Sequence, residues 1–324
     1  MAQTVMIERT GGPEVMALVD ASLPPPGPGE VRMRNTAIGL NYIDTYHRSG
    51  LYPVELPGGL GMEAAGLVEA VGPGVEGLAA GDRVATFGPA RGAYAAARNV
   101  PAASLFHVPD GIDDETAAAA LLKGCTAEFL AERAAQVAPG DAVLVHAAAG
   151  GVGLILTQWL KALGATVIGT ASSAAKCAAA SAAGADHMLL ADDPDAARQV
   201  RALTGGAGVR VSFDGVGAAS WALSLAATGR RGLIISYGNA SGPVSGVDLG
   251  VLARAGSLFV TRPTLFDYYA APAERAAGVA RLWDMILSGR VTVTIGQRYA
   301  LADVVTAHRD LEARRTSGST LLIP

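Results

Sequence analysis

The chain has 324 residues, among them 64 alanines and 41 glycines, and a length above ~250 residues favours two domains. Half of the residues are hydrophobic but only 5% are aromatic, so we expect a core of small and aliphatic side chains. Charged residues make up 17% and the net charge is -4, which argues against nucleic acid or an anionic membrane as the main partner. Two cysteines exclude both a disulfide framework and a four-cysteine zinc site.

The N-terminal segment, residues 1–10, alternates apolar and polar side chains like an edge strand. It has neither the basic region nor the long apolar region of a secretory signal. No uninterrupted apolar run reaches the ~18 residues that a membrane-spanning helix needs. We therefore expect a cytoplasmic protein.

Up to about residue 109, the sequence predicts short strands separated by glycine and proline, which is typical of a compact, barrel-like β-domain. These strands are predicted over residues 31–37, 64–71, 82–86 and 94–97. Two helices are predicted next, over residues 115–122 and 125–137, with Asp113 and Asp114 as possible N-caps.

The middle of the chain alternates short apolar strands with helical segments. Strands are predicted over residues 142–146, 166–170, 209–213, 232–236 and 257–261. Because these runs lack polar alternation, they indicate a parallel sheet buried on both faces. A helix over 274–288, a segment over 291–299, a helix over 301–312 and a strand over 320–323 complete the chain, and the last strand is expected to return to the first domain.

A glycine turn follows the strand at 142–146 and precedes a helical stretch. Its residues are Gly150, Gly151, Val152 and Gly153. Strand, glycine turn and helix in this order are the context of a dinucleotide fingerprint, in which Gly150 lets the backbone approach a pyrophosphate and Gly153 lets helix and strand pack closely. The alternative is a tight turn that binds nothing.

The choice of dinucleotide depends on the end of the second strand of this unit. NAD sites place a carboxylate about twenty residues beyond the turn, but no Asp or Glu occurs between Asp141 and Asp186. Instead Ser172, Ser173 and Lys176 follow the strand, and only three lysines occur in the chain. Hydroxyls and an ammonium favour the 2′-phosphate of NADPH. Alternatively, the serines cap the next helix and Lys176 is a surface charge.

With these features, the sequence resembles the zinc-independent quinone oxidoreductases of the medium-chain dehydrogenase/reductase superfamily over almost its whole length. The similar motifs lie at residues 41–50, 60–66, 81–84, 122–124, 147–153, 237–239 and 260–263. The resemblance implies an α/β fold in which a doubly wound Rossmann sheet is inserted in a GroES-like β-barrel catalytic domain. The expected domains are 1–124 and 266–324 for the catalytic domain and 125–265 for the NADPH-binding domain.

Zinc-dependent relatives carry a cysteine and a histidine where this chain has Asn41 and Met62, so we expect no catalytic zinc. The resemblance places Asn41 and Tyr46 beside the nicotinamide and Tyr52 along the substrate site, with turn stabilisation and core packing as alternatives. Asp44 is expected to cap a helix rather than act as an acid or base. Further cofactor contacts implied by the resemblance are Lys123, Thr126, Tyr237, Gly238, Asn239, Ser241, Pro263, Leu265 and Arg314. For Lys123, Thr126 and Arg314, helix capping or a solvated surface charge is an equal alternative.

The expected activity is NADPH-dependent reduction of a quinone by hydride or single-electron transfer, since a conjugated acceptor needs no Lewis acid. One alternative is NADPH-dependent reduction of the C=C bond of an enone. Another is a non-catalytic, NADPH-binding structural or regulatory protein. A homodimer is expected to form through the strand at 257–261, because exposed sheet edges favour pairing.

Overall fold

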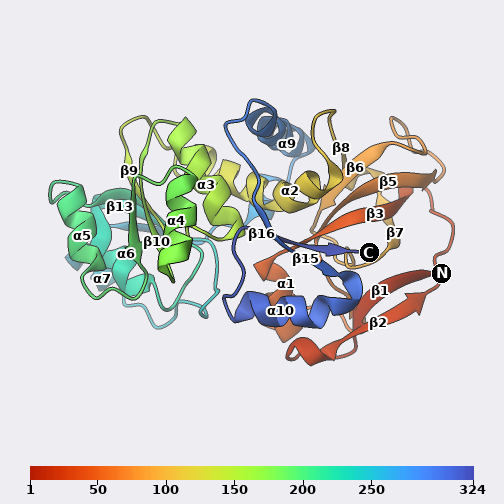
Figure 1. Ribbon diagram of the computed structural model, residues 1–324, viewed down its shortest axis with the longest axis horizontal. Helices are drawn as coiled ribbons and strands as arrows, with labels where there is room; N and C mark the ends of the chain where they lie inside the picture. The colour runs from red at the N-terminus through yellow and green to blue at the C-terminus, as the bar shows by residue number, and fades with distance from the viewer. The chain divides into compact units, whose positions relative to one another are not determined.

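The computed structural model describes residues 1–324, which form two compact units (Figure 1). The split unit consists of Met1–Lys123 and Val293–Pro324, and the central unit of Gly124–Thr292. The sequence predicts the return to the first unit at residue 266, whereas it lies at Val293. Helix α9 (Pro272–Leu287) accounts for the difference, because its Leu282 packs against Gly124 of the central unit.

The split unit contains two β-sheets. The larger has the order β15-β16-β3-β5-β6-β8, with β7 paired to β3, and is formed by β3 (Glu30–Leu40), β5 (Glu63–Val71), β6 (Arg83–Phe87), β7 (Ala97–Pro101), β8 (Leu105–His107), β15 (Ile295–Ala300) and β16 (Ser319–Ile323). The smaller has the order β2-β1-β4 and is formed by β1 (Ala2–Ile7), β2 (Met16–Ala21) and β4 (Gly58–Gly59). Because β16 pairs antiparallel with β3, the C-terminal strand lies in the larger sheet, beside a strand from the first 40 residues of the chain.

Helices α1 (Tyr42–Ser49), α10 (Val304–Glu312) and the first part of α2 (Asp114–Glu128) belong to the split unit, with 3₁₀ turns at Pro13–Val15, Ala102–Ser104 and Leu301–Asp303. Its core joins strand and helix residues such as Ile38, Val304 and Leu322. The predicted strand at 94–97 is wrong, since β7 begins at Ala97. Tyr94 is fully buried before β7, and its backbone forms hydrogen bonds with Leu60 and with Val5 of β1.

The central unit is built on one parallel sheet of six strands, in the order β11-β10-β9-β12-β13-β14. Its strands are β9 (Ala142–Val145), β10 (Thr166–Ala171), β11 (His187–Leu190), β12 (Val209–Asp214), β13 (Thr228–Ser236) and β14 (Phe259–Thr261). The strand order reverses between β9 and β12. In doubly wound sheets, ligands bind at this switch point, beyond the carboxyl ends of the strands.

The remaining helices of the central unit are α3 (Gly151–Ala162), α4 (Ala174–Ala182), α5 (Ala196–Leu203), α6 (Trp221–Ala227), α7 (Gly250–Arg254), α8 (Leu265–Tyr268) and α9. The two helices predicted at 115–122 and 125–137 are instead the continuous α2, followed by a π-helical segment, Phe129–Ala134. α2 continues through Gly124, where a Cβ atom would lie 2.3 Å from Leu282 Cδ1 of α9, so glycine lets the two helices approach closely here. No helix combines the length and the apolar composition needed to cross a membrane.

Candidate cofactor and acceptor site

The glycine turn lies between β9 and α3, with Gly150 at the N-cap. No side chain caps the start of α3, so the backbone N–H groups of its first turn can receive an anion. A Cβ atom on Gly153 would lie 2.3 Å from the carbonyl oxygen of Ala147, which only glycine avoids. A Cβ atom on Gly150 would lie 3.2 Å from the same oxygen. These residues fit a bound pyrophosphate.

The end of β10 presents no carboxylate. Ser172 and Ser173 are exposed directly after the strand, and Lys176 is half-buried in the first turn of α4. Asp186, the next acid along the chain, pairs with Lys161 at 2.8 Å. Ser173 Oγ accepts a hydrogen bond from the Lys176 backbone N–H at 3.3 Å, so the predicted capping role is present. Capping uses one lone pair of this hydroxyl and leaves its O–H able to donate to a phosphate.

In the split unit, Asn41 is buried between β3 and α1. Its Nδ2 donates to Glu63 Oε2 at 2.7 Å and to the Gly39 carbonyl oxygen at 3.3 Å. Both amide hydrogens are therefore used within the protein, and Oδ1 remains to accept a hydrogen bond. Toward a nicotinamide carboxamide, Asn41 can act as an acceptor.

Tyr46 and Tyr52 belong to one aromatic cluster. Their ring centroids lie 5.2 Å apart in an edge-on arrangement, and the ring centroids of Tyr42 and Tyr46 lie 5.7 Å apart. The Tyr52 backbone N–H also donates to the Tyr46 carbonyl oxygen at 3.1 Å. Tyr46 is 8% exposed, so most of its surface is packed against neighbouring side chains.

Glu63 is a central residue that the sequence reasoning missed. It is fully buried at the start of β5 and accepts hydrogen bonds from Asn41, from the Leu122 backbone N–H at 2.6 Å and from Lys123 Nζ at 3.1 Å. Lys123 is therefore a buried ion-pair partner and not a solvated surface charge. A carboxylate inside the otherwise apolar run 60–66 was the available signal.

Asp44 joins Asn41 to a second buried network. Its Oδ2 accepts from the Asn41 backbone N–H at 2.9 Å, which confirms the predicted capping role, and from Tyr94 Oη at 2.8 Å. Burial raises the pKa of Asp44 to about 7. Tyr94 also meets His308 Nε2 at 3.1 Å, and Arg48 lies 3.0 Å from His308 Nδ1. Burial, together with the charge of Arg48, lowers the pKa of His308 to about 3.

The central unit has its own buried network at the carboxyl ends of its strands. His146, after β9, meets Thr170 of β10 at 3.1 Å and Ser224 of α6 at 3.0 Å. Ser224 Oγ donates to Asp214 Oδ2 at 2.8 Å, and Asp214 Oδ1 accepts from Ser220 and from the backbone N–H groups of residues 216 and 217. Burial lowers the pKa of His146. The network fixes three neighbouring strand ends beside the glycine turn.

The other predicted cofactor contacts occupy loops and helix ends. Gly238 packs on Gly215, and Ser241 Oγ donates to the Val216 carbonyl oxygen at 2.8 Å and accepts from the Ala219 N–H at 3.0 Å. Tyr237 and Asn239 are half-buried in the same loop, Pro263 is half-buried after β14, Leu265 is buried at the start of α8, Thr126 is buried in α2, and Arg314 is exposed after α10.

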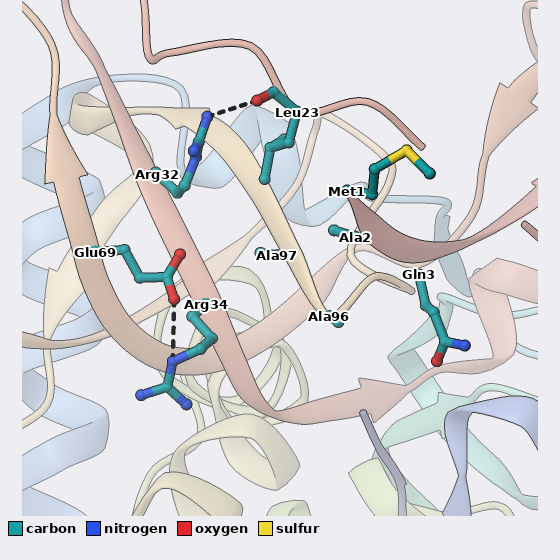
Figure 2. A pocket seen from close by; sticks show the side chains of 9 residues that line it. All are labelled: Met1, Ala2, Gln3, Leu23, Arg32, Arg34, Glu69, Ala96 and Ala97. Carbon is teal, nitrogen blue, oxygen red and sulfur yellow. Dashed lines mark hydrogen bonds and ion pairs between the residues drawn. The ribbon is translucent and has the colours of Figure 1, made fainter. Parts of the chain in front are cut away.

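A surface hollow of the split unit has none of these residues in its wall (Figure 2). Its lining consists of Met1, Ala2, Gln3, Leu23, Arg32, Arg34, Glu69, Ala96 and Ala97. Both arginines are engaged, Arg34 with Glu69 at 3.2 Å and Arg32 with the Leu23 carbonyl oxygen at 3.1 Å.

Nowhere in the chain do three or more His, Cys, Asp or Glu side chains gather as a metal would require.

Comparison with known proteins identifies relatives along the whole chain. The description "alcohol dehydrogenase GroES-like domain" matches residues 27–110, and "zinc-binding dehydrogenase" matches residues 151–272. A quinone oxidoreductase of Pseudomonas aeruginosa is 48% identical over 325 residues, 100% of both chains. A 2-haloacrylate reductase of a Burkholderia species is 42% identical, over 100% of this chain and 99% of its own. The crystal structure of Escherichia coli quinone oxidoreductase complexed with NADPH has 45% identity and a TM-score of 0.97, over 99% of this chain and 100% of that one. The predicted fold class, a Rossmann sheet with a GroES-like domain, is confirmed.

Proposed function

Because this chain belongs to the quinone oxidoreductases of the zinc-binding dehydrogenase family, we propose that it reduces quinones with NADPH as the electron donor. The observation that supports NADPH most directly is the composition of the segment after β10. Ser172, Ser173 and Lys176 follow this strand, and no acidic residue is present there. When bound, NADPH supplies a hydride from its nicotinamide ring.

The residues of this chain bind the cofactor and orient the acceptor beside it. The first turn of α3, with Gly150, Gly151, Val152 and Gly153, receives the pyrophosphate through backbone N–H groups. Ser172, Ser173 and Lys176 receive the 2′-phosphate. Asn41 Oδ1 accepts from the carboxamide, and the edges of Tyr46 and Tyr52 hold a flat acceptor ring. Thr126, the loop at 237–241, Pro263, Leu265 and Arg314 are proposed as further cofactor contacts.

The test compares NADPH with NADH at a fixed concentration of 1,4-benzoquinone. Lys176→Met is expected to lower the preference for NADPH roughly tenfold or more, since a charged hydrogen bond is lost. Lys161→Met is the matched control, because this lysine pairs with Asp186 and is expected to leave the preference unchanged. Equal kcat/KM values for the two nucleotides in the wild-type enzyme would contradict the proposal.

A second candidate activity is reduction of an activated C=C bond, and the similarity to a 2-haloacrylate reductase favours it. Reduction of such an acceptor needs the same hydride source and a hydrogen-bond donor for the carbonyl or carboxylate oxygen of the acceptor. Turnover of 1,4-benzoquinone, an enone and 2-chloroacrylate with NADPH separates the two activities. A kcat/KM that is higher for the alkenes than for the quinone would reverse the order of the candidates.

We also propose that the protein forms a homodimer by pairing of β14 with its copy. β14 is an edge strand of the central sheet, and its Phe259 is 63% exposed. An open, apolar strand edge favours pairing across a two-fold axis. Sedimentation velocity is expected to give a dimer for the wild type and for the control Leu287→Lys, and a monomer for Phe259→Lys. A wild-type monomer at micromolar concentration would exclude the dimer.

A further inference from the structure

The ammonium group of Lys123 is the most enclosed lysine charge of the molecule. The side chain is 5% exposed, and its ion pair with Glu63 has an Nζ–Oε2 distance of 3.1 Å. The other two lysine side chains are more open: Lys161 is 35% exposed in its ion pair and Lys176 is half-buried. Because burial of a charge is costly unless it is paired and hydrogen-bonded, the surroundings of Lys123 decide what it can do.

Glu63 holds Lys123 in a defined position. Its Oε1 accepts from the Leu122 backbone N–H, and its Oε2 accepts from both Lys123 Nζ and Asn41 Nδ2. A Cβ atom on Gly39 would lie 2.3 Å from Glu63 Oε2, so only glycine allows β3 to approach the carboxylate this closely. The ammonium and the Asn41 amide share one oxygen and therefore lie side by side.

The ammonium keeps two N–H groups that no protein acceptor uses. A lysine ammonium has three donors, and Glu63 Oε2 is the one acceptor within hydrogen-bond distance of Lys123 Nζ. The carboxyl group of Asp44 also interacts electrostatically with Lys123, but its hydrogen bonds are accepted from the Asn41 backbone N–H and from Tyr94 Oη. Two fixed donors beside Asn41 thus suit an oxygen that becomes negative during a reaction.

We propose that Lys123 is a catalytic residue of the quinone reduction, whose ammonium donates to the acceptor oxygen on which negative charge develops. The inference rests on the proposed function and on the proposed position of Asn41 beside the nicotinamide. The quinone gains a hydride, that is two electrons and one hydrogen, from NADPH, which leaves as NADP⁺. The hydroquinone monoanion so formed is stabilised by Lys123, and a proton from solvent completes the hydroquinone.

This role differs from cofactor binding, which the sequence resemblance implied for Lys123. A lysine that binds the nucleotide affects its affinity, whereas a donor to the reacting oxygen affects kcat. The ion pair with Glu63 still allows Lys123 to stabilise a negative oxygen, because Glu63 accepts from one N–H of the ammonium and the other two can donate to the acceptor. The two roles therefore give different results in the same variants.

The kinetic test uses Lys123→Met, which removes the charge at similar length, and Lys161→Met as the matched control. We expect kcat with 1,4-benzoquinone to fall roughly a hundredfold in Lys123→Met, as for loss of one oxyanion donor, while the Kd of NADPH stays at the wild-type value. Lys123→Arg keeps the charge and is expected to recover part of kcat. The double variant Glu63→Gln with Lys123→Met removes both charges of the ion pair, so no unpaired charge stays buried. If Lys123→Met alone does not fold, the double variant replaces it, and the same fall in kcat is expected.

A binding measurement reads the same contact without turnover. 4-Nitrophenol, added to the NADP⁺ complex, is expected to bind to the wild type as the coloured phenolate, with a lowered apparent pKa, and to lose this shift in both Lys123→Met variants. A raised Kd of NADPH with unchanged kcat in these variants, or an unchanged phenolate shift, would overturn the proposal. Absence of NADPH oxidation by quinones in the wild type would instead refute the proposed function, and the phenolate shift would still report on Lys123.

Discussion

Both units bury an aspartate that reaches a histidine through a hydroxyl group, but the two aspartates are satisfied differently. In the central unit, Asp214 accepts four hydrogen bonds, which use both of its oxygens. In the split unit, both hydrogen bonds of Asp44 are made to Oδ2, and Oδ1 is buried with no donor. The first arrangement fixes a loop, whereas the second leaves a carboxyl group whose charge depends on pH near neutrality.

The largest effect that tests this comparison is expected at Asp214. Asp214→Ala would remove the carboxylate acceptor of Ser224 and of two backbone N–H groups in the central unit, and would leave Ser220 with the Gly217 carbonyl oxygen alone. Several unpaired buried donors make a loss of about 4 kcal/mol in the free energy of unfolding the expected result, measured by urea denaturation. Asp195→Ala, which removes an exposed ion pair with Arg198, is the control and is expected to change little.

A loss below about 1 kcal/mol in Asp214→Ala would mean that the donors find other partners. The comparison between a satisfied and an unsatisfied carboxyl group would then fail. The same variant also tests the position of the glycine turn, because Asp214 acts through Ser224 on His146 beside it.

The next effect concerns the pH dependence of stability at Asp44. Its pKa in the folded protein is about 7, raised by burial from the ordinary 3.8, so the folded state binds the proton more tightly than the unfolded state. The stabilisation from Asp44 is thus complete below about pH 4 and is lost as the pH rises through 7. Asp44→Asn removes this contribution. Relative to this variant, the wild type is expected to lose about 1 kcal/mol per pH unit between pH 5 and 7.

Urea titrations of the wild type and Asp44→Asn at a series of pH values measure this difference. The lowered pKa of His308 acts in the opposite direction in this range, but it is common to both proteins and cancels in the comparison. Parallel stability curves for the two proteins would show that Asp44 is already ionised in the folded state at pH 5.

The contrast between the networks also shows what the sequence could predict. The apolar runs of β9, β10 and β12 and the turn at 147–153 were predictable, because parallel strands and glycine turns are local patterns. The capping role of Asp44 was predictable for the same reason. The contact of Arg48 with His308, 260 residues apart, and that of Lys123 with Glu63, 60 residues apart, depend on chain folding that no local spacing encodes.

The smallest expected effects come from removing the central hydroxyl group of each network. Tyr94→Phe removes the donor to Asp44 and the partner of His308, and Ser224→Ala removes the donor to Asp214 and the partner of His146. Each variant is expected to lose about 1–2 kcal/mol of unfolding free energy at pH 7.

Their pH dependence separates the two hydroxyl variants. Since the hydrogen bond from Tyr94 lowers the pKa of Asp44, its loss raises that pKa further, and the pH-dependent part of the stability curve extends above pH 7 in Tyr94→Phe. Ser224→Ala is expected to shift the curve down without changing its shape in this range, because Asp214 keeps three donors. Equal curve shapes in both variants would show that Tyr94 packs beside Asp44 without setting its charge, and the unpaired Oδ1 would then be the sole difference between the two carboxyl groups.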